Sequence, residues 1–293
     1  MSESGNAPPS TLAELVSPLT EAQFLDLLRR RELAYRPGSK GDGYAPLAGW
    51  TALRDLLASG NPPVPRDHIQ VTKESRTIPS DKWTTDGRAD PAKLQEFLAK
   101  GFSVVVLRLE EHVPALAAVC NEIKTRLRER AFAGVIVTSG TGAGAFKIHF
   151  DPEDLVILQV EGTKRWQVFG PVVRNPLRDL QKAKPENPEP ILDEVLQPGD
   201  LLFVPGGYWH HCESGLSTSV HLGIFFLPPA GWHAINEALQ TLITDELFRI
   251  PLSRLDAQTS LATLEQEIKN RAIEKIKSLQ LQEFLTRWQD IAR

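Results

Sequence analysis

Apolar residues at helical spacing dominate the first hundred positions of the chain. They recur every three to four positions in residues 20–28 and 50–57, and a third such segment begins at Asp90-Pro91 and stops at Gly101. These patterns predict three helices. Residues 69–83 mix short alternating runs with turn residues, which predicts short strands beside the helices.

From about residue 100 to residue 228 the period changes to that of β-strands. Short apolar or alternating runs are bounded by glycine and proline turns, with one amphipathic helical stretch at 113–130. The predicted strands cover residues 102–109, 134–137, 154–160, 164–169, 201–204 and 217–226.

After Pro228 the helical spacing returns, at 232–243 and 264–291, without a strand signal. We therefore expect four regions along the chain. They are a flexible tail (1–12), an N-terminal helical or mixed region packed on the next one (13–90), a strand-rich domain (91–228) and a C-terminal helical region (229–293).

Composition limits the classes of protein to consider. With 293 residues, 41% of them hydrophobic, the chain can bury one strand-rich domain with accessory helices. A net charge of −4 argues against a dominant nucleic-acid surface, and two cysteines support neither a disulfide framework nor a zinc site. No apolar run reaches the length of a membrane span and no signal-peptide pattern opens the chain, so we expect a soluble, cytoplasmic protein without a membrane partner.

The candidate chemistry begins at His149 and Asp151, which stand two residues apart. On a strand, residues i and i+2 point to the same face, so this pair can bind one ion while Phe150 points away. Two histidines and one carboxylate form the facial triad that holds non-haem Fe(II) and leaves positions open for a keto acid and dioxygen. The third ligand must then come from a neighbouring strand.

Lys164 is the second candidate. It shares a strand face with Trp166 and Val168 in the hairpin that follows Asp151. On the outer face it would be a solvated charge. On the inner face it would be a cation among apolar side chains, which is costly unless an anion such as the distal carboxylate of a keto acid meets it.

Four motifs in this order resemble those of the JmjC and cupin-type 2-oxoglutarate oxygenases, in particular the bacterial branch related to ribosomal oxygenases and asparaginyl hydroxylases. The resemblance covers roughly residues 100–228 and is far more specific than any single motif. The motifs are His149-x-Asp151, Gly162-Thr163-Lys164-Arg165-Trp166, Pro198-Gly199-Asp200 and Pro205-x-Gly207-x-x-His210.

The resemblance implies a fold and a set of site residues. The fold is α+β, with a double-stranded β-helix of the JmjC jelly-roll type at residues 91–228. The residues matching the family's motifs are His149, Asp151 and His210 for Fe(II), Lys164 for the C5 carboxylate of 2-oxoglutarate, and His221 and Gly223 as further lining of the cosubstrate pocket. The sequence departs from the pattern at Phe146, where related hydroxylases often carry a threonine that binds the cosubstrate.

Two further residues are candidates for contact with substrate or ligands. On a strand Lys147 would lie on the same face as His149 and Asp151, so it would face the mouth of the site. Trp209 would form a wall of the site. His211, the next residue after the implied ligand on the same strand, would point away from the metal. The glycine-containing segment 138–145 reads equally well as a plain connector or as a rim loop at the site.

The function implied by the resemblance is hydroxylation of a protein or peptide side chain with Fe(II), 2-oxoglutarate and O₂, releasing succinate and CO₂. Hydroxylation of a free amino acid or small metabolite is an alternative, and a non-catalytic cupin-like binding or scaffold protein is a third possibility. By analogy the C-terminal helices would make the protein a homodimer. The chain is also expected to lack the winged-helix module of the larger ribosomal oxygenases.

Overall fold

The computed structural model describes residues 8–38, 44–140, 142–171, 173–177, 189–255 and 260–288. Two compact units divide it. Unit 1 comprises Met1–Leu127 and Ala131–Leu227, and unit 2 comprises Arg128–Arg130 and Pro228–Arg293. Each unit is described by itself below.

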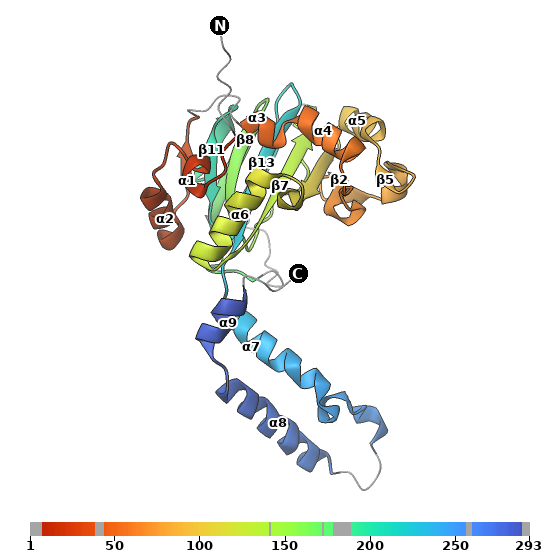
Figure 1. Cartoon of the computed structure of the whole chain (residues 1–293), viewed down its shortest axis with the longest axis vertical. Helices are drawn as coiled ribbons and strands as arrows, with labels where there is room; N and C mark the ends of the chain where they lie inside the picture. Colours follow the sequence, from red (N-terminus) through yellow and green to blue (C-terminus); the bar gives the residue numbers. More distant parts are fainter. Residues whose placement is uncertain are drawn as a thin grey trace. The chain divides into compact units, whose positions relative to one another are not determined.

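Unit 1 is built on a large sheet of eight strands (Figure 1). The pairs β11–β8, β8–β13, β6–β7 and β2–β6 are antiparallel. In spatial order the strands are β1 (Ala34–Arg36), β11 (Leu201–Val204), β8 (Asp154–Glu161), β13 (Ser219–Leu227), β7 (Arg130–Thr138), β6 (Ser103–Leu107), β2 (Ile69–Lys73) and β3 (Arg76–Ile78).

A second, three-stranded antiparallel sheet has β9 at its centre. Its strands are β10 (Leu192–Leu196), β9 (Lys164–Pro171) and β12 (Tyr208–Ser214), and a separate small hairpin pairs β4 (Thr84–Thr85) with β5 (Arg88–Ala89). Apolar side chains of the two larger sheets pack together into one interior cluster, including Ile157 of β8, Leu202 of β11 and Val168 of β9. This arrangement is the jelly roll that the sequence predicted.

Strand β8 is buried on both faces, which explains its uninterrupted apolar sequence. Leu155 and Ile157 point into the interior between the sheets. Val156, Leu158 and Val160 alternate with them and join the larger core that the helices cover. The strand therefore separates a structural core from the interior that holds the polar candidates.

Helices cover the other face of the large sheet. Helix α6, visible across the sheet in Figure 1, buries Leu116, Val119 and Ile123 in the larger core. The helices of unit 1 are α1 (Leu12–Leu15), α2 (Glu21–Arg30), α3 (Ala45–Ala48), α4 (Trp50–Ser59), α5 (Pro91–Ala99) and α6 (Pro114–Leu127), with 3₁₀ turns at Arg66–His68, Ser80–Lys82 and Leu109–Glu111.

Two predicted boundaries in unit 1 were wrong. The helix expected at 113–130 ends at Leu127, because Arg128 adopts a left-handed conformation (φ 57°) and strand β7 begins at Arg130. The flexible tail expected at 1–12 is too long. Pro9 is buried, Leu12 is 1% exposed, and Thr11 caps helix α1 by accepting a hydrogen bond from the Glu14 amide. Residues 1–7 of the predicted tail lie outside the described residues.

Unit 2 consists mainly of helices α7 (Gly231–Gln240), α8 (Leu261–Lys277) and α9 (Leu281–Trp288), with 3₁₀ turns at Thr241–Thr244, Glu246–Arg249 and Leu252–Arg254. Within this unit the Arg130 guanidinium lies 3.9 Å from the centre of the Trp288 ring, and His233 packs on the same ring. The helical pattern predicted to Ile291 breaks at 278–280, and its last residues lie outside the described part of the chain. Among the described residues no helix combines the length and apolarity needed to cross a membrane.

Candidate metal centre

His149 does not lie on a regular strand, contrary to the prediction. It forms an isolated antiparallel bridge with His210 of β12, in which each backbone amide donates to the other residue's carbonyl oxygen, at 3.1 and 2.8 Å. Asp151 follows in an irregular segment. Strand alternation therefore does not place His149 and Asp151 as had been predicted. The backbone bridge brings His149 beside His210 instead.

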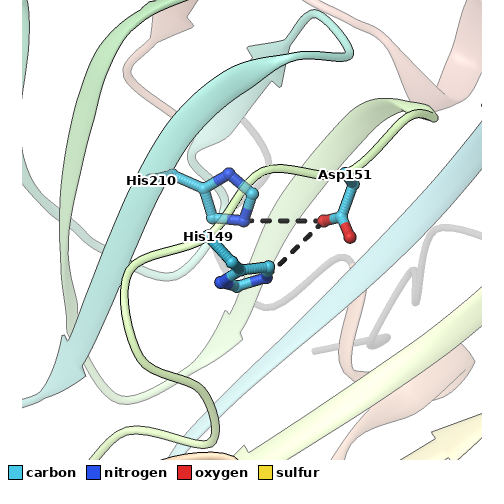
Figure 2. A group of neighbouring side chains, drawn as sticks. All are labelled: His149, Asp151 and His210. Atoms are coloured by element: carbon cyan, nitrogen blue, oxygen red, sulfur yellow. Dashed lines mark ion pairs between the residues drawn. The ribbon is translucent and has the colours of Figure 1, made fainter. Parts of the chain in front are cut away.

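The three side chains converge on one point (Figure 2). One carboxylate oxygen of Asp151 lies 3.8 Å from Nε2 of His149 and 3.6 Å from Nε2 of His210. One potential ligand atom from each residue lies within 4.8 Å of the others, and the two imidazole centroids are 4.4 Å apart. A single ion could contact all three atoms.

Backbone carbonyls orient both imidazoles. Nδ1 of His149 lies 2.8 Å from the Lys147 carbonyl oxygen, and Nδ1 of His210 lies 3.1 Å from that of Tyr208. A carbonyl oxygen only accepts hydrogen bonds, so each Nδ1 carries the hydrogen of this contact and each Nε2 is the ring nitrogen left to face the other candidate ligands. Such outer partners are typical of histidine ligands to metals.

The turn before β12 holds Asp151 in place. The Gly207 amide donates to the Asp151 carbonyl oxygen at 2.8 Å. Gly207 has φ +89°, and a Cβ there would lie 2.6 Å from the Val173 carbonyl oxygen, so this position requires glycine. The amide of the preceding residue, Gly206, donates to the buried carboxylate of Asp154 at 2.6 Å.

Arg31 connects this turn to the N-terminal part of the chain. Its guanidinium donates to the Gly206 carbonyl oxygen at 2.8 Å and lies 3.3 Å from the Asp154 carboxylate. Burial raises the pKa of Asp154, while Arg31 and the Gly206 amide oppose that rise. Nothing in the sequence pattern singled out Arg31, because its partners lie more than a hundred residues away.

The protonation state of His210 fits a metal ligand. Burial lowers its pKa to about 4, with a further lowering from His149 and an opposing effect of Asp151. At neutral pH the ring is therefore neutral, and Nε2 can donate its lone pair. Two imidazoles and a carboxylate on one side of a point are a donor set suited to Fe(II) with open positions.

Lys164 points into the interior between the sheets. Its side chain is fully buried, and its ammonium donates to Oγ1 of Thr138 on β7 at 3.0 Å. Burial lowers its pKa, and an interaction with Cys212 opposes this. Within the described part of the chain no carboxylate forms an ion pair with Lys164. A buried cation without such a partner is costly, so the interior is suited to a bound anion.

Two further buried polar atoms in this interior have no hydrogen-bond partner among the described residues. They are Nε1 of Trp166 and Nδ1 of His221. The Trp166 ring packs on both His210 and His221, with centroid distances of 5.7 and 5.4 Å, and therefore lies between the candidate ligand and the lysine side of the interior. Burial, followed by Lys164, holds the pKa of His221 well below its usual range, so the ring is neutral. With Lys164, these atoms fit a dicarboxylate cosubstrate.

Gly223 lies on the strand face that carries His221. A Cβ at this position would come within 3.0 Å of the Phe225 ring. The lack of a side chain at Gly223 therefore lets the Phe225 ring lie close to the strand, and the role of Gly223 in lining the cosubstrate pocket stays a prediction.

The ring of Trp209, which was expected to form a wall of the site, packs on Phe150 with a centroid distance of 5.2 Å. Trp166 takes the place next to His210 instead. The sequence placed Trp166 on the same face as Lys164, which was the signal for its role. Thr138 had no such signal, because it reaches Lys164 from another strand. Phe146, which replaces the family's threonine, packs on the His149 ring at 5.4 Å.

Lys147 is exposed, and it lies elsewhere than its parity suggested, because segment 147–151 is not a regular strand. It lines a cavity of about 520 Å³ together with residues that alternate with the inward-facing ones on β9 and β12. His211 is one of these, so it points away from the interior as predicted. The other lining residues are Glu74, Gly142, Gly144, Phe146, Ile148, Gln167, Phe169 and Glu213. Of the predicted rim loop 138–145, Thr141 lies outside the described residues.

Residues 116–234 match the JmjC domain. The matched segment is similar to JmjC domains and covers less than half of the chain. Over 239 residues it is 27% identical to the bifunctional lysine-specific demethylase and histidyl-hydroxylase NO66 of Drosophila persimilis, a match covering 80% of this chain and 34% of that protein. It is 28% identical to the uncharacterized protein YxbC of Bacillus subtilis, covering 82% of this chain and 78% of that one. The chain thus spans about a third of the length of the NO66 relative.

Solved structures of YcfD from Escherichia coli are similar to this protein. One has a TM-score of 0.55 at 18% identity and covers 90% of this chain and 70% of that one. Another, described as a ribosomal oxygenase in complex with cobalt and 2-oxoglutarate, has a TM-score of 0.53 at 17% identity, covering 90% and 69%. At this level of identity the likeness concerns the fold, and it confirms the predicted α+β jelly roll.

Proposed function

We propose that this protein is an Fe(II)- and 2-oxoglutarate-dependent oxygenase that hydroxylates a side chain of a protein or peptide. The observation that carries the proposal is the convergence of His149, Asp151 and His210 at the edge of an interior that contains the buried Lys164. A metal ion could bind the three donor atoms of the triad, and an anion beside Lys164 would offset the free-energy cost of burying its charge. A non-catalytic binding protein would need neither.

Separate sets of residues would bind the metal and the cosubstrate. His149, Asp151 and His210 would hold Fe(II), and Lys164, with Thr138 beside it, would hold the distal carboxylate of 2-oxoglutarate. A bound Fe(II) supplies the oxidative chemistry, in which 2-oxoglutarate and O₂ yield succinate and CO₂ while a C–H bond becomes C–OH. Trp166 and the apolar side chains around it keep water from the interior. Nδ1 of His221, which has no hydrogen-bond partner among the described residues, would donate a further hydrogen bond to an oxygen of the cosubstrate.

The cavity beside His149 favours a protein or peptide as the substrate. Phe146 lines it and also packs on the His149 ring, so a segment bound there would lie close to one of the three candidate ligands. Lys147 is then a substrate contact. The names of the NO66 and ribosomal oxygenase relatives refer to side-chain or ribosomal oxygenation, which supports the same substrate class.

The test follows succinate formation. The anaerobic complex with Fe(II) and 2-oxoglutarate is given either peptides or free amino acids before oxygen is admitted, with Asp151→Ala as the control. We expect peptides to stimulate succinate release and to gain 16 Da by mass spectrometry in the wild type only. Stimulation by a free amino acid alone, with its hydroxylated product, would support the small-molecule alternative. Absence of succinate under every condition would support the scaffold alternative.

The homodimer expected from the sequence remains part of the proposal. Unit 2 exposes several large apolar side chains, among them Ile273 (47% exposed) and Ile276 (42% exposed) on helix α8. Light scattering should give twice the chain mass for the wild type, and Ile273→Asp with Ile276→Asp should lower it. The cytoplasmic location also stays a prediction.

A further inference from the structure

The tip of the β2–β3 hairpin contacts the segment that leads to His149. Lys73 pairs with Arg76, so Glu74 and Ser75 form a two-residue turn, and both have positive φ (49° and 66°). Such a turn normally carries asparagine or glycine, because other side chains are strained there. Strained backbone of this kind persists only where the surrounding contacts hold it in place.

Three hydrogen bonds join this turn to the segment before His149. The Glu74 amide donates to the Gly144 carbonyl oxygen at 3.2 Å, and the Ser75 amide donates to that of Ala145 at 2.9 Å. The third bond involves a side chain, since the Lys147 amide donates to Oγ of Ser75 at 3.1 Å. The hairpin tip therefore fixes the peptide plane on the N-terminal side of Lys147.

Lys147 passes this constraint to the candidate ligand. Its carbonyl oxygen accepts the hydrogen of His149 Nδ1 at 2.8 Å and thereby directs Nε2 toward Asp151 and His210. We infer that Ser75 is a positioning residue for the metal centre, setting the orientation of His149 through Lys147. The inference rests on the proposed function, because it presupposes that a metal binds at the triad.

The two histidines differ in how much outside support they need. His210 is 3% exposed, lies on strand β12, and takes its orienting carbonyl from the same strand, at Tyr208. His149 belongs to an irregular segment with a single bridge, and its side chain is 35% exposed. The hydrogen bond between Ser75 and the Lys147 amide therefore helps to set the orientation of His149, whereas the orientation of His210 is set by its own strand.

Binding of Co(II) to the whole metal-free protein tests the inference without requiring turnover. The key variant is Ser75→Gly, because glycine adopts the observed φ without strain but provides no side-chain acceptor. We expect its thermal stability to equal or exceed that of the wild type, while the Kd for Co(II) rises about 10–100-fold, as for loss of other outer partners of metal ligands. The visible spectrum of bound Co(II) should change as well.

Two further variants separate the hydrogen bond from other effects. Ser75→Asn keeps an acceptor oxygen and tolerates a positive φ, so it should bind Co(II) within about twofold of the wild type. Thr77→Ala changes an exposed residue of the same hairpin and should have no effect. Wild-type Kd and spectrum in Ser75→Gly would overturn the inference, as would equal losses in the Gly and Asn variants. If the wild type itself failed to bind Co(II), the proposed metal site would fall together with the inference.

Discussion

His149 and His210 form a backbone bridge in which each residue donates to and accepts from the other, although 61 positions separate them in the chain. The bridge sets the two imidazole centroids 4.4 Å apart, with both Nε2 atoms directed at the Asp151 carboxylate. Two ligands from distant segments are thus brought together by main-chain hydrogen bonds, which do not depend on the side chains. Variants at either histidine should therefore lose metal affinity without losing the fold.

Replacement of His149, Asp151 or His210 by alanine should remove metal binding. Each supplies one of the three donor atoms, so the affinity for Co(II) or Fe(II) should fall by more than the roughly 10–100-fold that loss of an outer partner costs. Anaerobic calorimetry measures the affinity and circular dichroism checks the fold. The matched control is His211→Ala, which changes the neighbouring outward-facing histidine and should bind metal normally. Normal metal binding in His210→Ala would move the third ligand elsewhere.

Lys164→Met should weaken 2-oxoglutarate binding and at the same time stabilise the cosubstrate-free protein. The lost charge-assisted hydrogen bond should raise the KM for 2-oxoglutarate at least about tenfold. Without cosubstrate the buried ammonium only costs free energy, so the Tm should rise. Succinate assays and thermal melts provide the two measurements. Arg165→Met, on the outer face one residue away, should leave this KM unchanged, and an unchanged KM in Lys164→Met would exclude the lysine from cosubstrate binding.

The metal-free protein should lose stability as the pH falls from about 6.5 to about 4. Burial lowers the pKa of His210 to about 4, whereas the unfolded chain titrates near 6.5. Between these values only the unfolded state takes up the proton, so the free energy of unfolding decreases by on the order of 3 kcal/mol across the window. His221 acts in the same direction. Urea unfolding in chelator at several pH values gives the dependence, and a curve equally steep in His210→Gln would contradict the assignment.

Arg31→Met should destabilise the turn that positions Asp151. Removal of the guanidinium leaves the buried Asp154 carboxylate without its cation, a change that costs about 3 kcal/mol in comparable buried pairs. Adding Asp154→Asn should restore part of that loss, because the uncompensated charge is then gone. Urea unfolding of the two single variants and the double variant gives the coupling energy. Strictly additive losses would show that the pair does not act as a unit.

The sequence by itself determined the elements and the identity of most candidate site residues. The helical spacing predicted α2, α4 and α5, and the change to short apolar runs predicted the strands β6, β8 and β9, because side-chain periodicity reflects which faces are buried. Lys164 could be placed on the face of Trp166, since alternation along one strand needs no tertiary information.

The tertiary structure decided everything that depends on contacts between distant segments. The bridge between His149 and His210, the approach of Thr138 to Lys164 and the contact of Arg31 with Asp154 join residues 26 to 123 positions apart. The parity argument at Lys147 failed for the same reason: hydrogen bonds from Glu74 and Ser75 hold that segment in an irregular conformation. Local periodicity carries no information about such bonds, because the partner that bends a segment lies elsewhere in the chain.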